Sequence, residues 1–148
     1  MDSSLARYNV NGLSDIGTTR KVNQDSIYLN SNEGLFIVAD GMGGHLGGEI
    51  ASALCIERVV EFYQKNFNKL QHQTIEDCDL NEISSAAINS ASKAIYQKSL
   101  EEPRLRGMGT TTTLIRFFGS SIHYAHVGDS RLYLLRCGLL YQITNDHS

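Results

Sequence analysis

The sequence is poor in proline, in cysteine and in net charge. The single proline, Pro103, excludes a proline-rich linker. The three cysteines, Cys55, Cys78 and Cys137, are odd in number and far apart, and no two of them form a Cys-x-x-Cys pair. They are therefore expected to be reduced thiols of a cytoplasmic protein rather than zinc ligands or disulfides. A net charge of −3 provides no basic surface, so no nucleic-acid partner is expected.

Long apolar runs are also missing. No window approaches the apolar length of a transmembrane helix. The first four residues, Met1-Asp2-Ser3-Ser4, lack the basic and apolar regions of a signal peptide, so no membrane partner is expected. An apolar content of 41% and a charged content of 20% fit a globular protein, and 148 residues predict one domain spanning 1–148.

The strongest chemical signal is an aspartate that follows an apolar run. Residues 35–39 read as a buried strand, which ends on Asp40 and is followed by three glycines within four residues. A strand that delivers a carboxylate into a glycine-rich turn presents a hard oxygen ligand at a sheet end. The glycines allow the backbone to approach an ion or a phosphate closely. From the residues alone, Asp40 could instead accept hydrogen bonds from the amides of its turn.

Two further aspartates and one arginine lie in comparable settings. Asp129 follows an apolar stretch and a glycine, and Asp25 follows Arg20 at a short interval. Three carboxylates at strand ends, together with an arginine, predict a divalent-metal site that handles phosphate. The plainer alternatives are an ordinary turn aspartate at 129 and a solvated arginine beside Lys21.

Five short segments follow one another along the chain and carry a family resemblance. They are Ser14-Asp15-Ile16-Gly17 with Arg20, Asn23 and Asp25; Asp40-Gly41-Met42-Gly43-Gly44; Gly109-Thr110-Thr111; Val127-Gly128-Asp129-Ser130-Arg131; and Thr144-Asn145-Asp146-His147-Ser148. Their order and spacing resemble the motifs of the PPM family in its bacterial form. These are the metal-dependent serine/threonine protein phosphatases, also called protein phosphatase type 2C. The match spans nearly the whole chain.

The periodicity of the chain predicts an α+β fold. Strands are expected at 8–13, 26–29 and 35–40, and then helices over 47–67 and from 79 to just before Pro103. Two hairpins are expected after them, pairing 110–118 with 122–127 and 131–136 with 139–143. The resemblance implies the N-terminal part of a four-layer α-β-β-α sandwich with two antiparallel sheets.

The resemblance also implies roles for individual residues. Asp40 and the Gly41 carbonyl would bind two Mn²⁺ or Mg²⁺ ions that activate a water, and Asp129 would bind a further, weaker ion. Arg20 would hold the substrate phosphate, and Asp25 would hydrogen-bond water on the metal. At the position of Met42, eukaryotic members carry a histidine thought to protonate the leaving group. Bacterial members commonly have a methionine there, which cannot donate a proton.

The function implied is hydrolysis of phosphoserine or phosphothreonine in proteins that a serine/threonine kinase has phosphorylated. Family members continue beyond 146–148 with more strands, helices and two more metal-binding aspartates, so the domain is expected to be truncated at its C-terminal side. A non-catalytic remnant that at most binds phosphoprotein or metal weakly is the alternative, and an unrelated metal-binding α+β domain is a third.

Overall fold

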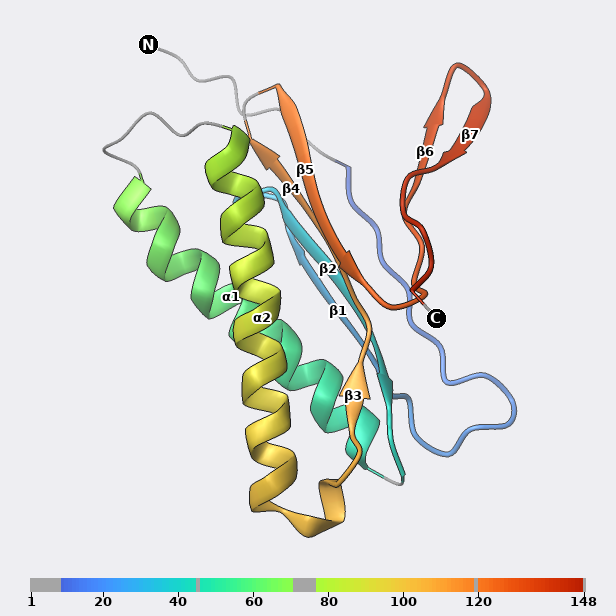
Figure 1. Cartoon of the computed structure of the whole chain (residues 1–148). Helices are drawn as coiled ribbons and strands as arrows, with labels where there is room; N and C mark the ends of the chain where they lie inside the picture. The colour runs from blue at the N-terminus through green and yellow to red at the C-terminus, as the bar shows by residue number, and fades with distance from the viewer. Residues whose placement is uncertain (1–8, 45, 71–76, 119, 148) are drawn as a thin grey trace.

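Two long helices cover one face of an antiparallel sheet, and a separate hairpin lies away from the helices (Figure 1). The computed structural model describes residues 9–44, 46–70, 77–118 and 120–147. The main sheet has the order β1-β2-β4-β5, and the short β3 pairs with the end of β2. The strands are β1 (Asp25–Asn30), β2 (Leu35–Met42), β3 (Gly109–Thr110), β4 (Thr112–Phe118) and β5 (Ser121–Val127). The hairpin is β6 (Tyr133–Arg136) with β7 (Leu139–Gln142).

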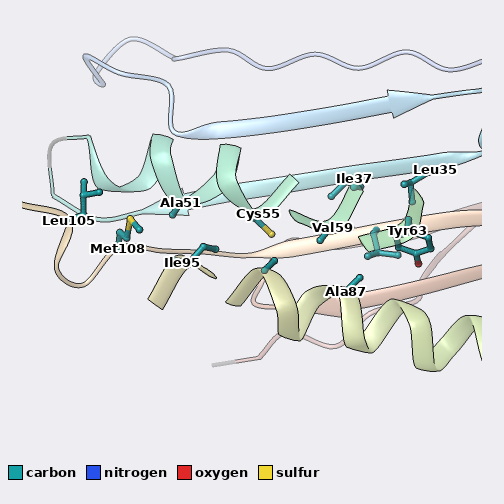
Figure 2. Close-up of a cluster of buried hydrophobic side chains, with 12 residues drawn as sticks. Leu35, Ile37, Ala51, Cys55, Val59, Tyr63, Ala87, Ile95, Leu105 and Met108 are labelled. Atoms are coloured by element: carbon teal, nitrogen blue, oxygen red, sulfur yellow. The ribbon is translucent and has the colours of Figure 1, made fainter. Parts of the chain in front are cut away.

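The helices α1 (Gly47–Leu70) and α2 (Asp77–Glu101) pack on each other and on the sheet. Figure 2 shows the buried cluster between them. Side chains at every fourth position of α1 form one apolar stripe, as expected for residues one helical turn apart: Ala51, Cys55, Val59 and Tyr63. This stripe meets Leu35 and Ile37 of β2, and Ala87 and Ala91 of α2 join the same cluster, so the core lies between the sheet and both helices.

Alternation along β2 decides where Asp40 points. Leu35, Ile37 and Ala39 are buried on the helix side, whereas Val38 and Asp40 are exposed. Successive strand residues point to opposite faces, so Asp40 belongs to the face that the helices leave open. The sequence pattern that builds the core therefore also presents the carboxylate.

Most predicted elements are confirmed with small shifts in their ends. The first helix begins at 47 as predicted, and the second ends before Pro103. The second begins at 77, so the helix-start signal expected at 79 lies inside the helix. In the β6–β7 turn, Cys137 and Gly138 have φ of 53° and 78°, as a two-residue type I′ turn requires.

Two strand predictions were wrong. Residues 9–13 form no strand, and Tyr8 lies outside the described residues. A short segment does not form a strand unless a neighbouring strand pairs with it, and none of the described strands pairs with this one. The strand expected over 110–118 is interrupted at Thr111, where its amide donates to the Asp40 carbonyl at 2.9 Å.

Candidate functional site

Strand pairing places two aspartates opposite each other. In the β1–β2 ladder, Asp25 lies across from Asp40 at the end of the two strands. Directly opposed residues of an antiparallel pair share a face, and their Cβ atoms are about 4.5–5.5 Å apart. Two like charges in this position are unfavourable unless a proton or a cation lies between them. The repulsion between Asp25 and Asp40 is therefore locally destabilising, as is common at binding sites.

The backbone around Asp40 is packed too tightly for any side chain at Gly41. The Gly41 amide donates to the Gln24 carbonyl at 3.1 Å, and Ser52 of α1 donates its hydroxyl to the same carbonyl at 2.7 Å. A Cβ at Gly41 would overlap the Gly48 carbonyl oxygen and lie 2.6 Å from the Gln24 carbonyl oxygen. Glycines at 41 and 48 thus let the start of α1 meet the end of β2 directly.

Two threonines hold the backbone of Asp40. The Asp40 amide donates to the Thr111 hydroxyl at 3.0 Å, and the Thr110 hydroxyl donates to the Asp40 carbonyl at 2.9 Å. Thr111 also shares a hydrogen bond of 2.7 Å with the Ser130 hydroxyl. The segment that carries Asp129 is therefore tied to the strand that carries Asp40.

Asp146 and His147 of the C-terminal motif form hydrogen bonds with the loop that contains Asp129. Arg131 donates to both carboxylate oxygens of Asp146, at 2.6 to 3.1 Å. The His147 amide donates to the Gly128 carbonyl at 2.8 Å. Asp146 and His147 thus fix the position of the Asp129 loop.

A cleft of about 200 Å³ opens beside the paired aspartates, and we call it the carboxylate cleft. It brings together Arg20, Asp25, Asp40 and Gly41, four of the five residues proposed from the sequence. Its full lining is Asp15, Ile16, Arg20, Val22, Asn23, Gln24, Asp25, Asp40 and Gly41. Asp129 does not line this cleft, although its charge acts on Asp40. The cleft therefore combines acidic groups with one arginine.

The surroundings of Asp40 favour its neutral form. Partial burial raises the pKa of the Asp40 carboxyl above its ordinary value. The charge of Asp25 and a hydrogen bond with it raise that pKa further, as does the charge of Asp129, while Arg20 acts in the opposite direction. A bound cation would relieve this repulsion, and carboxylate oxygens are the ligands that Mg²⁺ and Mn²⁺ prefer.

The described residues fit a metal in chemistry but do not enclose one. Among residues 9–44, 46–70, 77–118 and 120–147, no three His, Cys, Asp or Glu side chains form a group able to hold an ion. Asp40 and Asp25 thus provide part of a ligand set. The metal-binding roles of Asp40, Gly41 and Asp129 stay predictions.

Sequence reasoning missed two contributions to the site. Asp15 lines the cleft, with its carboxylate accepting the Gly17 amide at 2.7 Å, although it had been read only as part of a motif. Thr110 and Thr111 were likewise named only as part of a motif, yet their hydroxyls position the backbone of Asp40. The motif Gly109-Thr110-Thr111 was the sequence signal that could have indicated the role of these two threonines.

A larger hollow than the carboxylate cleft lies elsewhere. It has about 950 Å³, lies between α2 and β5, and is lined by three histidines but by no carboxylate: His123, His126 and His147. His123 and His126 are three residues apart on β5, so their side chains point to opposite faces of the sheet. This hollow does not carry the predicted chemistry. No helix in the described part of the chain has the length and apolarity to cross a membrane.

Comparison with known proteins gives a consistent result. A family model described as protein phosphatase 2C matches residues 17–148. The serine/threonine protein phosphatase PstP of Mycobacterium tuberculosis is 41% identical over 133 residues, which are 90% of this chain and 24% of PstP. The serine/threonine phosphatase Stp of Listeria monocytogenes is 36% identical over 90% of this chain and 52% of its own length.

A solved structure agrees. The catalytic domain of PstP in complex with two manganese ions has a TM-score of 0.76 and 41% identity, covering 90% of this chain and 54% of that one. This chain thus spans from a quarter to about half the length of these relatives. The extent of the family match and the shared fold lead to one conclusion: the chain belongs to the protein phosphatase 2C family.

Proposed function

We propose that the protein is a metal-dependent serine/threonine phosphatase, and that residues 1–148 supply the N-terminal half of its catalytic domain. The observation that carries the proposal is the carboxylate cleft, where Asp25 and Asp40 face each other beside Arg20. The names of the relatives support the substrate class, because PstP and Stp are serine/threonine phosphatases.

Each residue of the cleft has a distinct task in this proposal. Arg20 binds the substrate phosphate, since a planar guanidinium can donate two parallel hydrogen bonds to it. Asp40, with the Gly41 carbonyl, would hold divalent cations, and Asp25 would orient water next to them. Asp129 holds a further ion at the neighbouring loop. Met42 is exposed two residues after Asp40 and has no proton to give, so the leaving serine or threonine oxygen would take its proton from water.

The cofactor is Mn²⁺ or Mg²⁺. When bound, two such ions offset the phosphate charge and lower the pKa of a water. The PstP structure with two manganese ions supports this choice. The phosphoproteins are expected to be products of a serine/threonine kinase in the cytoplasm. Cys55 and Cys137 are free thiols, which is consistent with a reducing compartment.

A second candidate function applies to residues 1–148 on their own. The described part of the chain has no group of three side chains able to hold an ion. The chain alone would then bind phosphate and metal weakly through Arg20 and Asp40, without turnover. We regard this as a property of the isolated half rather than of the phosphatase.

The test is release of phosphate from a phosphothreonine peptide with Mn²⁺, using the protein as its gene encodes it. Replacing Arg20 with Ala removes charge-assisted hydrogen bonds of about 1.5–3 kcal/mol, so kcat/KM should fall roughly 10- to 150-fold. The matched control is Arg136→Ala, because Arg136 is also exposed but lies on the separate hairpin. Unchanged turnover in Arg20→Ala would refute the assignment of the phosphate site.

A further inference from the structure

We propose that a second hollow, which shares a wall with the carboxylate cleft, binds the residues flanking the phosphorylated residue and selects acidic and aliphatic side chains there. The inference rests on the proposed function and names the substrate preference of that site. The hollow has about 370 Å³ and is lined by Arg20, Lys21, Val22, Gln24, Gly43 and Leu46. We call it the Lys21 hollow.

The position of this hollow relative to the reaction is set by shared residues. Arg20, Val22 and Gln24 line both the Lys21 hollow and the carboxylate cleft. Gln24 is held at this boundary, because its side-chain amide donates to the Gly43 carbonyl at 3.3 Å. A phosphate bound by Arg20 would therefore lie at the junction, and the peptide attached to it would extend into the neighbouring hollow.

The carboxylate cleft is mainly acidic, whereas the charged residues of the Lys21 hollow are basic. The carboxylate cleft contains Asp15, Asp25 and Asp40, whereas no acidic residue lines the Lys21 hollow. In the described part of the chain, neither Arg20 nor Lys21 takes part in an ion pair. Lys21 is exposed and free to meet an anion, so an acidic flanking residue is the complementary partner.

The apolar part of the hollow adds a second preference. Leu46 is 48% exposed, although it is a large aliphatic side chain next to the start of α1. Val22 is half-buried on the opposite, N-terminal segment. An aliphatic side chain of the substrate would cover both and gain from the water it displaces. The hollow thus fits a phosphorylated segment with a leucine-like residue and a glutamate-like residue beside the phosphate.

The experiment compares phosphothreonine peptides with the protein as its gene encodes it. Glu-Leu, Gln-Leu, Lys-Leu or Glu-Ala is placed on the N-terminal or on the C-terminal side of the phosphothreonine. p-Nitrophenyl phosphate has no flanking residue and reports on the carboxylate cleft alone. The variants are Lys21→Gln, Leu46→Ala and the milder Leu46→Met. Lys93→Gln and Leu100→Ala on α2 are matched controls, as Lys93 is also exposed and Leu100 is 55% exposed.

The proposal expects a Glu-Leu preference on one side of the phosphothreonine. Replacing Glu with Gln in the peptide should raise KM roughly two- to fivefold, as for an exposed charge pair, and added salt should weaken the effect. In Lys21→Gln this difference should disappear, with kcat unchanged. Leu46→Ala should raise KM for Glu-Leu but not for Glu-Ala peptides, and Leu46→Met should retain most of the preference.

The measurements distinguish failure of the proposed subsite from failure of the proposed function. If p-nitrophenyl phosphate and peptides are hydrolysed but all peptides have the same KM, or if Lys21→Gln keeps the full Glu preference, the Lys21 hollow is not the flanking subsite. If Lys93→Gln removes the preference equally, the effect is one of overall charge and the proposal is again wrong. If no substrate is turned over, the proposed function itself fails, and the subsite fails with it.

Discussion

Replacing Gly41 with Ala tests how closely the site depends on the contact between β2 and α1. A methyl group at this position would overlap the Gly48 carbonyl oxygen and lie 2.6 Å from the Gln24 carbonyl oxygen. Both neighbours are backbone atoms, so no side-chain rotation relieves the overlap. The start of α1 or the end of β2 has to move, although ordinary contacts begin at about 3.4 Å.

The cost can be estimated from two sources. Overpacking of a well-packed site destabilises proteins by about 1–3 kcal/mol. The shift also strains the hydrogen bond of 3.1 Å from the Gly41 amide to the Gln24 carbonyl, worth about 1 kcal/mol. We therefore expect Gly41→Ala to lower the free energy of unfolding by about 2–4 kcal/mol. A displacement of about 1 Å at Asp40 should lower turnover on the order of a hundredfold.

The assays are urea unfolding and Mn²⁺-dependent hydrolysis of a phosphothreonine peptide. The matched control is Gly44→Ala in the same glycine-rich turn, because a Cβ there meets no heavy atom within 4 Å. This variant should stay within about 0.5 kcal/mol of the wild type and remain active. Wild-type stability and turnover in Gly41→Ala, or equal damage in Gly44→Ala, would contradict the packing argument.

Three further predictions concern other parts of the site and the core. Hydrogen bonds from Arg131 hold the pKa of Asp146 below its ordinary value. The ion pair therefore contributes stability above the unfolded pKa of about 3.9, and this stability is lost as the pH falls through the lower folded pKa. The difference in melting temperature between wild type and Asp146→Asn should shrink on acidification, and a constant difference would contradict this account. Thr111→Val removes the acceptor of the Asp40 amide and should destabilise the protein by about 0.5–1.5 kcal/mol in urea unfolding, while an unchanged midpoint would count against that hydrogen bond. Burial raises the pKa of the Cys55 thiol, so a thiol reagent should label the exposed Cys137 well before Cys55 in peptide mapping, and equal rates would contradict the burial of Cys55.

The parts of the fold that the sequence predicts are those where local pattern and tertiary packing agree. The apolar stripe of α1 and the apolar run that forms β2 both pack into the core, so both elements could be located from the sequence. The cleft residues Arg20, Asp25 and Asp40 were found because each lies in a recurring short motif, and the structure brings them together.

The remaining features depend on contacts between distant segments. The pairing of Asp25 with Asp40 follows from strand register, which a list of motifs does not give. The support that Thr111 gives to Asp40 joins residues 71 positions apart in the sequence. The failed strand at 9–13 has no neighbouring strand among the described residues to pair with.

Binding of Mn²⁺ to wild type and to Asp40→Asn tests the central claim most directly. Isothermal titration calorimetry on the protein as its gene encodes it should show Mn²⁺ binding, and the binding should be lost in Asp40→Asn because the ligand loses its charge. Glu57→Gln, an exposed acid on α1, is the matched control and should bind as the wild type does. Equal Mn²⁺ affinity in wild type and Asp40→Asn would contradict the claim that Asp40 is the principal metal ligand of this site.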